Sequence, residues 1–157
     1  MILSTPLFSI IKKQLPESEI TVLASVPNHN VIRNNPNVDK ILIFDKSPLK
    51  LAVLYSKLKK INFDYLIDPK DHYSRESKLI ATVVHAKQKI GFIGDKKKSP
   101  FTRGIADSIM NENVHYISRV LNALTCMSIK TPEQIPLPEL FTSADSDYKI
   151  NKFFEKY

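Results

Sequence analysis

Glycine and cysteine are both scarce in this sequence of 157 residues. Only 3 glycines stand beside 10 prolines, which argues against a nucleotide-binding loop of the glycine-rich kind. Cys126 is the only cysteine, so the chain cannot form an internal disulfide, and a reducing compartment suits it best. No apolar run approaches the roughly 20 residues of a membrane-spanning helix, and the first residues lack the basic start of a secretory signal peptide. We therefore expect a cytoplasmic protein.

Positive charge is concentrated in the first two thirds of the chain. Lysine and arginine number 23 against 16 aspartates and glutamates, which gives a formal net charge of +7. Residues 1–103 hold 18 of the basic and 9 of the acidic residues, whereas residues 104–157 hold 5 and 7. A basic front of this kind suits an anionic partner such as nucleic acid, a phosphorylated sugar or a membrane surface. Surface lysines that are exposed to solvent and bind no partner would give the same total charge.

Short apolar runs alternate with amphipathic stretches along most of the chain. The apolar runs predict strands at residues 20–25, 40–45, 65–68 and 89–93. The amphipathic stretches predict helices at residues 5–15, 28–36, 48–61, 75–84, 115–127 and 142–157. Continuous apolar strands are typical of parallel sheets that helices cover on both faces. The pattern therefore predicts a Rossmann-like α/β fold with an open parallel sheet, which binds ligands beyond the carboxyl ends of its strands.

The first predicted helix has no strand in front of it. A right-handed βαβ unit would begin with a strand, so we expect either a fold that begins with a helix or a sheet whose first strand is missing from this sequence.

Four stretches carry motifs whose order and spacing are more distinctive than any one of them. They are LSTPLFSIIKKQLPESEITVLAS at residues 3–25, NNPNVDKILIFDK at 34–46, FDYLIDPKDHYSRES at 63–77 before KQKIGF, and NENVHYISRVLNAL at 111–124. The most specific is N-P-x-V-D-K-x-x-x-F-D, which runs from Asn35 to Asp45. Taken together, these motifs resemble the N-terminal lobe of the lipopolysaccharide heptosyltransferases, which are ADP-heptose-dependent glycosyltransferases.

The resemblance implies one half of a GT-B fold, in which two Rossmann-like lobes face each other across a cleft. It assigns residues 1–142 to the acceptor-side lobe and residues 143–157 to a helix that leads to a C-terminal lobe. The nucleotide sugar would bind that absent lobe, so no cofactor is expected on this chain. In the family a first strand ends in Gly-Asp, whose aspartate acts as the base, and aligning Thr5-Pro6 places this pair just before Met1. We therefore expect no catalytic residue here, and no transfer by the chain alone.

The acceptor-binding candidates combine this resemblance with the position of loops after strands. By resemblance, Arg75 matches the basic residue that begins a helix and faces the acceptor phosphates, a task that suits the bidentate fork of a guanidinium. An arginine that is only exposed near a helix start is the alternative. Ser4 and Thr5 would offer hydroxyls and free N–H groups at a helix start, although ordinary capping fits them equally. The basic loop after residue 93 would be a phosphate-binding lid or simply a solvated charge run. The full candidate set is Ser4, Thr5, Lys70, Asp71, Arg75, Lys96, Lys97, Lys98 and Arg103.

Metal binding is not expected at the end of the third predicted strand. Asp68, Asp71 and His72 follow one another there, but D-x-x-D-H is not a recognised metal signature. A strand-ending aspartate more often forms loop hydrogen bonds, and contact with a polar acceptor is the functional alternative.

These features predict the acceptor-binding lobe of a glycosyltransferase. The acceptor would be a phosphorylated, lipid-linked saccharide, and the donor, by resemblance, ADP-heptose. The location would be cytoplasmic, and peripheral contact with the inner membrane stays open. One alternative is a free-standing α/β module that binds nucleic acid or another polyanion through Lys96, Lys97 and Lys98. Another is a non-catalytic relative of the transferases.

Overall fold

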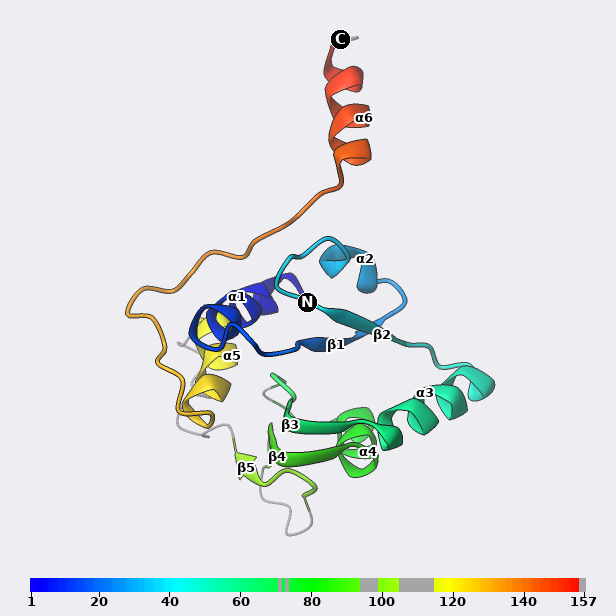
Figure 1. Ribbon diagram of the computed structural model, residues 1–157, viewed down its shortest axis with the longest axis vertical. Helices are drawn as coiled ribbons and strands as arrows, with labels where there is room; N and C mark the ends of the chain where they lie inside the picture. The colour runs from blue at the N-terminus through cyan, green and yellow to red at the C-terminus, as the bar shows by residue number, and fades with distance from the viewer. Residues whose placement is uncertain (71, 73, 94–98, 105–114, 156–157) are drawn as a thin grey trace.

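The computed structural model describes residues 1–70, 72, 74–93, 99–104 and 115–155 (Figure 1). Its strands are β1 (Thr21–Ser25), β2 (Lys40–Phe44), β3 (Asn62–Ile67), β4 (His85–Gly91) and β5 (Arg103–Gly104). Its helices are η1 (Ile2–Ser4), α1 (Thr5–Gln14), α2 (His29–Ile32), α3 (Pro48–Lys60), α4 (Arg75–Val83), α5 (Tyr116–Thr125) and α6 (Ala144–Phe154). Strands and helices alternate from α1 to β4, as the sequence predicts.

All strand pairs in the described residues are parallel, and they form two sheets. β1 pairs with β2, with Thr21 opposite Lys40. β3 pairs with β4, and β4 pairs with the short β5, in the order β3-β4-β5. β1 lies between β2 and β3 in Figure 1, so the two sheets lie side by side in the strand order β2-β1-β3-β4-β5. The predicted parallel sheet is confirmed, with its strands divided between two hydrogen-bonded groups.

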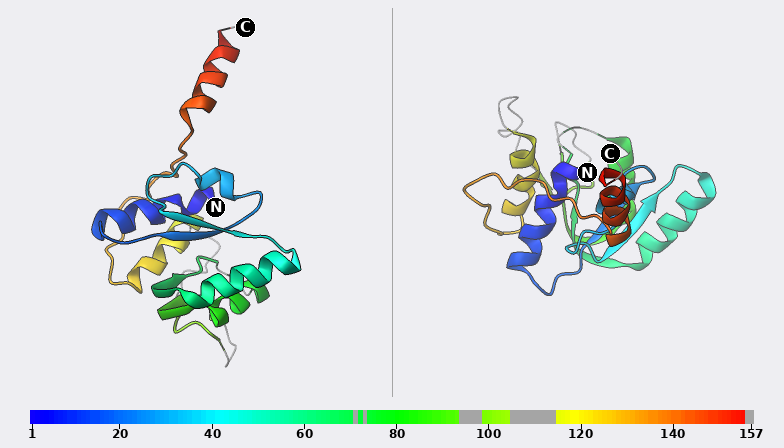
Figure 2. Two further views of the ribbon diagram at one scale, coloured as in Figure 1. Left: turned by 45° about the vertical axis from the view of Figure 1, so that its right-hand side comes forward. Right: turned by 90° about the horizontal axis from the view of Figure 1, so that it is seen from above.

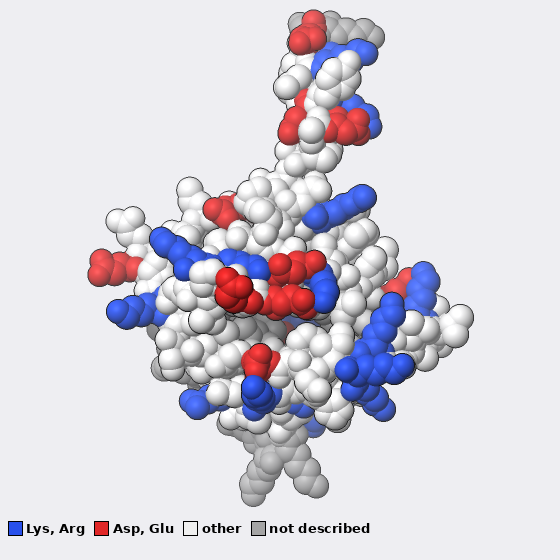
Figure 3. Space-filling view, in the orientation of Figure 1, with Lys and Arg blue, Asp and Glu red and all other residues white. Residues whose placement is uncertain are grey.

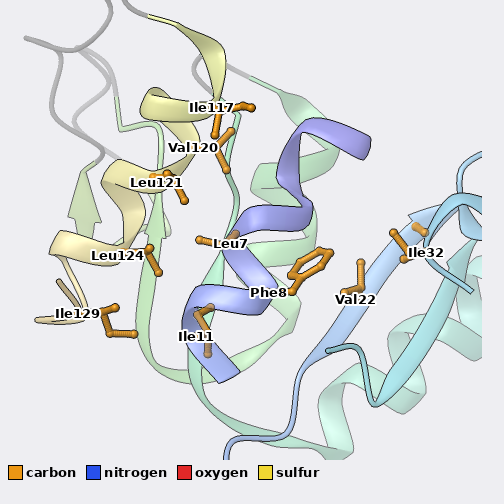
Figure 4. Packing of buried hydrophobic residues seen from close by; sticks show 11 residues of the cluster. Leu7, Phe8, Ile11, Val22, Ile32, Ile117, Val120, Leu121, Leu124 and Ile129 are labelled. Atoms are coloured by element: carbon orange, nitrogen blue, oxygen red, sulfur yellow. The ribbon is translucent and has the colours of Figure 1, made fainter. Parts of the chain in front are cut away.

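The larger part of the core lies between α1, α5 and β1. The buried side chains that meet there are Leu7, Phe8, Ile11, Val22, Ala24, Ile32, Ile117, Val120, Leu121, Leu124 and Ile129 (Figure 4). Each large apolar side chain buried in this way contributes about 1.5–3 kcal/mol relative to exposure. α1 and α5 are distant in sequence and pack against each other in this core, so they cover the same side of the strands.

A second core lies on the other side of the strands, under α3 and α4. Leu54 and Leu58 of α3 are buried there with Val84. Leu23 of β1 and Leu66 of β3 pack against the same cluster, so both sheets share one helical cover. Helices therefore flank the strands on both faces, which confirms the predicted Rossmann-like α/β class.

Several predicted boundaries are wrong. β3 begins at Asn62 rather than at residue 65, and β4 spans His85–Gly91 rather than residues 89–93. The start of β4 is rich in polar residues, and its pairing with β3 rather than its own hydrophobicity makes it a strand. On α4 the large side chain of Leu79 is half exposed, whereas the small Ala81 is fully buried.

The chain after α5 runs out along the surface and ends in α6. Residues 131–143 form neither helix nor strand, and α6 stands apart from the rest of the fold (Figures 1 and 2). Four large apolar residues of the helix are exposed, namely Tyr148, Ile150, Phe153 and Phe154. The helix itself is confirmed, and its role as a link to a second lobe stays a prediction. Across the described residues, no helix combines the length and apolar character needed to cross a membrane.

Candidate functional site

The loop after β3 and the start of α4 bring polar side chains together at the carboxyl ends of β3 and β4. β3 ends at Ile67, and the backbone N–H of Asp68 donates to the Ile90 carbonyl of β4 (2.9 Å). The Asp68 carboxylate then accepts from the backbone N–H of Lys70 (3.4 Å), which makes the chain turn away from the sheet. This turn directs the following residues toward α4.

Lys70 is held by two hydroxyls of α4. Its ammonium donates to Ser77 Oγ (3.0 Å) and Ser74 Oγ (3.4 Å). Ser74 is the N-cap of α4, because its Oγ also accepts from the Ser77 backbone N–H (3.3 Å). One ammonium and two hydroxyls thus converge at a helix start, where unpaired backbone N–H groups add positive potential. This set of donors favours an anion such as a phosphate.

An ion pair connects this helix start to the end of β2. Lys46, in the loop between β2 and α3, lies 2.7 Å from Glu76 in the first turn of α4. The Lys46 ammonium lowers the pKa of the Glu76 carboxyl below its ordinary value of 4.5, so Glu76 is ionised at neutral pH. The loop after β2 and the start of α4 therefore meet at one edge of the molecule.

A small hollow opens beside the same helix start. It is lined by Asp68, Ser74, Ser77 and Lys78 on one side, by His72, and by Phe92, Ile93, Ser99, Pro100 and Phe101 from the chain after β4. Its free volume of about 10 Å³ matches roughly one water molecule. In its present shape the hollow admits a small polar group and not a whole sugar, so a saccharide would lie over its mouth.

Arg103 lies at the flank of this region and not with Lys70. It belongs to β5, opposite Ile90 near the end of β4, and its side chain is exposed. The sequence predicts no strand at Arg103, whereas the structure pairs it with Ile90 of β4. β5 forms because Thr102 bonds both backbone groups of Lys89, with its Oγ1 accepting from the N–H (2.9 Å) and its N–H donating to the carbonyl (2.7 Å).

Ser4 and Thr5 are buried at the start of α1. Thr5 Oγ1 donates to the Ile2 carbonyl (2.8 Å) and accepts from the Glu139 backbone N–H (2.9 Å). The Thr5 hydroxyl is therefore engaged inside the chain, where it fastens the extended segment before α6. Ser4 precedes α1 as its N-cap residue, and its side chain makes no capping bond.

The other predicted candidates differ in what the structure says of them. Arg75 is the first residue of α4 and is exposed beside Ser74, and its contact with a ligand stays a prediction. Asp71 and the run Lys96, Lys97 and Lys98 lie outside the described residues. Within the described part of the chain, no three His, Cys, Asp or Glu side chains gather as a metal site would require.

Sequence reasoning missed the residues that complete this site. Ser77, Lys78 and Lys46 all lie at or beside the start of α4, and none of them is among the predicted residues. The serine could have been found from its spacing, because the third residue after an N-cap commonly faces the cap. The Lys46–Glu76 pair had no such signal, since only the arrangement of the strands brings these residues together.

Two solved structures are similar to this chain over nearly its whole length. One is the glycosyl transferase family 9 protein from Veillonella parvula DSM 2008, with a TM-score of 0.76 and 18% sequence identity over 99% of this chain. The other is the E. coli ADP-heptose lps heptosyltransferase II, with a TM-score of 0.68 and 16% identity over 98% of this chain. The chain has a glycosyltransferase-like fold. This finding confirms the predicted resemblance at the level of structure.

The likeness extends over only part of each neighbour. The chain covers 45% of the Veillonella protein and 46% of the E. coli enzyme, so it spans about half the length of these glycosyltransferases. Comparison of the sequence alone finds no matching family model and no matching curated protein. At 16–18% identity, the likeness is one of fold.

Proposed function

We propose that this chain is the acceptor-binding lobe of a glycosyltransferase, and that the start of α4 binds the phosphate of a phosphorylated saccharide. The observation that carries the proposal is the convergence of Lys70, Ser74 and Ser77 at a helix start, beyond the ends of parallel strands. Open α/β sheets bind ligands at that edge. The glycosyltransferase-like fold supports a saccharide as the ligand.

Each basic residue of the site would contribute differently to phosphate binding. Lys70 supplies a point charge that its serine partners hold in place, and exposed Arg75 supplies a fork that can bind two phosphate oxygens. Lys78 lines the same hollow and adds a third cation. The Lys46–Glu76 pair neutralises the one carboxylate in the first turn of α4, so that it repels an incoming anion less.

Transfer itself belongs, in this proposal, to a complete enzyme of about twice this length. A second lobe would bind the nucleotide sugar, which by the resemblance is ADP-heptose, and a carboxylate would take the proton from the acceptor hydroxyl as it attacks. The lobe described here would position a lipid-linked acceptor. We expect the isolated chain to bind a phosphorylated saccharide without transferring sugar to it.

Calorimetric titration of the chain tests this function. A phosphorylated heptose or a similar sugar phosphate should bind, and the same sugar without phosphate should bind at least about tenfold more weakly, as expected when charge-assisted hydrogen bonds are lost. Lys70→Ala and Arg75→Ala should weaken binding of the phosphorylated sugar and leave binding of the unphosphorylated sugar unchanged. Lys13→Ala, on the exposed side of α1, should not weaken binding of either sugar. Equal binding of both sugars, or preferential binding of RNA, would contradict the proposal.

A further inference from the structure

One long segment of the chain is basic without interruption. Residues 46–63 contain five lysines and no aspartate or glutamate. Most of this segment is α3, over which blue side chains gather in the space-filling view (Figure 3). The segment is thus a candidate surface for an anionic partner.

The outward face of α3 is apolar as well as basic. Leu54 and Leu58 are buried under the helix, yet Leu49 is 76% exposed and Val53 is 49% exposed on the opposite side. At 3.6 residues per turn, Leu49, Val53, Ser56 and Lys60 fall on one outward stripe. Lys57 and Lys59 lie to either side of that stripe. Apolar side chains therefore stand between lysines on a face that the rest of the described chain leaves uncovered.

The charges at the two ends of α3 are used differently. At its start, Lys50 pairs with Asp45 (2.6 Å) and Lys46 pairs with Glu76 (2.7 Å). At its end, Lys57, Lys59 and Lys60 have no ion-pair partner among the described residues. Three cations in the last turn of the helix are therefore free to meet an external anion.

We infer that the outer face of α3 binds the surface of an anionic phospholipid bilayer. Lysines beside an acidic membrane gain attraction from the negative surface potential, and apolar side chains among them enter the headgroup boundary. The lysines could also bind the phosphates of a nucleic acid, but the exposed Leu49 and Val53 would add nothing to that binding. Proteins that bind single strands stack the bases on aromatic side chains, not on aliphatic ones. The combination of charge and aliphatic exposure favours the bilayer.

This surface adjoins the candidate site. α3 begins at Pro48, two residues after Lys46, and the Lys46–Glu76 pair fixes that point to the start of α4. A bilayer under α3 would therefore lie beside the edge that carries Lys70 and Arg75. The inference stands on α3 alone and does not depend on what that site binds.

Vesicle flotation of the intact chain tests the inference. The chain should float with vesicles of phosphatidylcholine and phosphatidylglycerol in equal parts, should not float with phosphatidylcholine alone, and should dissociate as salt is raised. Replacing Lys57, Lys59 and Lys60 by glutamine should reduce partitioning about a hundredfold, from the usual contribution of each lysine near an acidic surface. Replacing Lys13, Lys130 and Lys152 by glutamine changes the net charge equally and should leave most of the binding intact.

A second variant separates the apolar contribution from charge. Leu49→Ser with Val53→Ser alters exposed positions only, so the fold should persist while partitioning to the acidic vesicles falls. The inference is overturned if the unaltered chain ignores acidic vesicles, if both lysine triples lose binding equally, or if the α3 lysines are needed for RNA and not for vesicles. Because the vesicles carry no saccharide, failure here leaves sugar-phosphate binding to be judged by its own titration.

Discussion

The ring of Phe101 occupies the space beside Gly91 where any other residue would place its Cβ. A Cβ built on Gly91 would lie 2.5, 2.7 and 2.8 Å from three carbons of that ring. Phe101 is buried, and the residues after it return alongside β4 as β5. Gly91 therefore allows the chain after β4 to fold back over the sheet and to close one wall of the hollow beside α4.

Gly91→Ala should destabilise the fold by about 1–3 kcal/mol, the usual cost of forcing extra volume into a packed region. Chemical denaturation would measure this loss. The double variant Gly91→Ala with Phe101→Leu should recover part of it, because the smaller side chain frees space for the new methyl group. A Gly91→Ala variant as stable as the original chain would show that the ring does not restrict this position.

Thr5 controls the attachment of the segment that leads to α6. Thr5→Val removes the hydroxyl that accepts from the Glu139 N–H, and we expect a loss of about 1–2 kcal/mol of stability, as for other buried hydrogen bonds. Hydrogen exchange at the Glu139 amide should accelerate in this variant. Thr5→Ser keeps the hydroxyl and should keep the amide protected. Unchanged exchange in Thr5→Val would show that the segment is held elsewhere.

Asp39 makes the stability depend on pH in acid. Lys12 and the Ile20 N–H bond its carboxylate, which lowers its pKa below the ordinary value of 3.8. The carboxylate therefore stabilises the folded state above pH 3.8, and this contribution is lost as the pH falls through the lower folded-state pKa. Asp39→Asn should be less stable than the original chain at neutral pH and nearly equal to it in strong acid. A stability difference that stays constant with pH would contradict this role.

Leu124 tests the core between α1 and α5. It is fully buried, so Leu124→Ala should cost about 2–5 kcal/mol in the free energy of unfolding. Leu137 provides the matched control, because it is 84% exposed and its truncation should cost almost nothing. Thermal and chemical unfolding of both variants would compare them directly. Equal effects would mean that α5 does not pack as described.

The sequence predicted the elements whose signal is local. Buried runs such as that of β1 and the amphipathic stretch of α5 have their own hydrophobic pattern. The apolar residues Ile117, Val120, Leu121 and Leu124 of α5 are all buried. β4 was misplaced because its first residues are polar and depend on β3 for pairing. Strand pairing is a tertiary property, which a single stretch of sequence does not display.

The motif from Asn35 to Asp45, which carries much of the resemblance, has a structural role here. Asn35 Oδ1 accepts from the Asn37 N–H, and Asp39 joins the end of α1 to the start of β1. Asp45 accepts from the Ser47 N–H before α3, and Lys50 lowers its pKa. The motif thus predicted the fold well because its polar residues shape turns. It said little about the site, whose members meet only after β2, β3 and α4 are assembled.

The most direct test of the acceptor-binding proposal is to map a bound sugar phosphate by NMR. We predict that the backbone signals of Ser74 to Lys78 and the side-chain signals of Lys70 and Arg75 shift together on titration, and that unphosphorylated sugar does not shift them. Shifts confined to other parts of the chain, or the absence of any shift at saturating sugar phosphate, would contradict it.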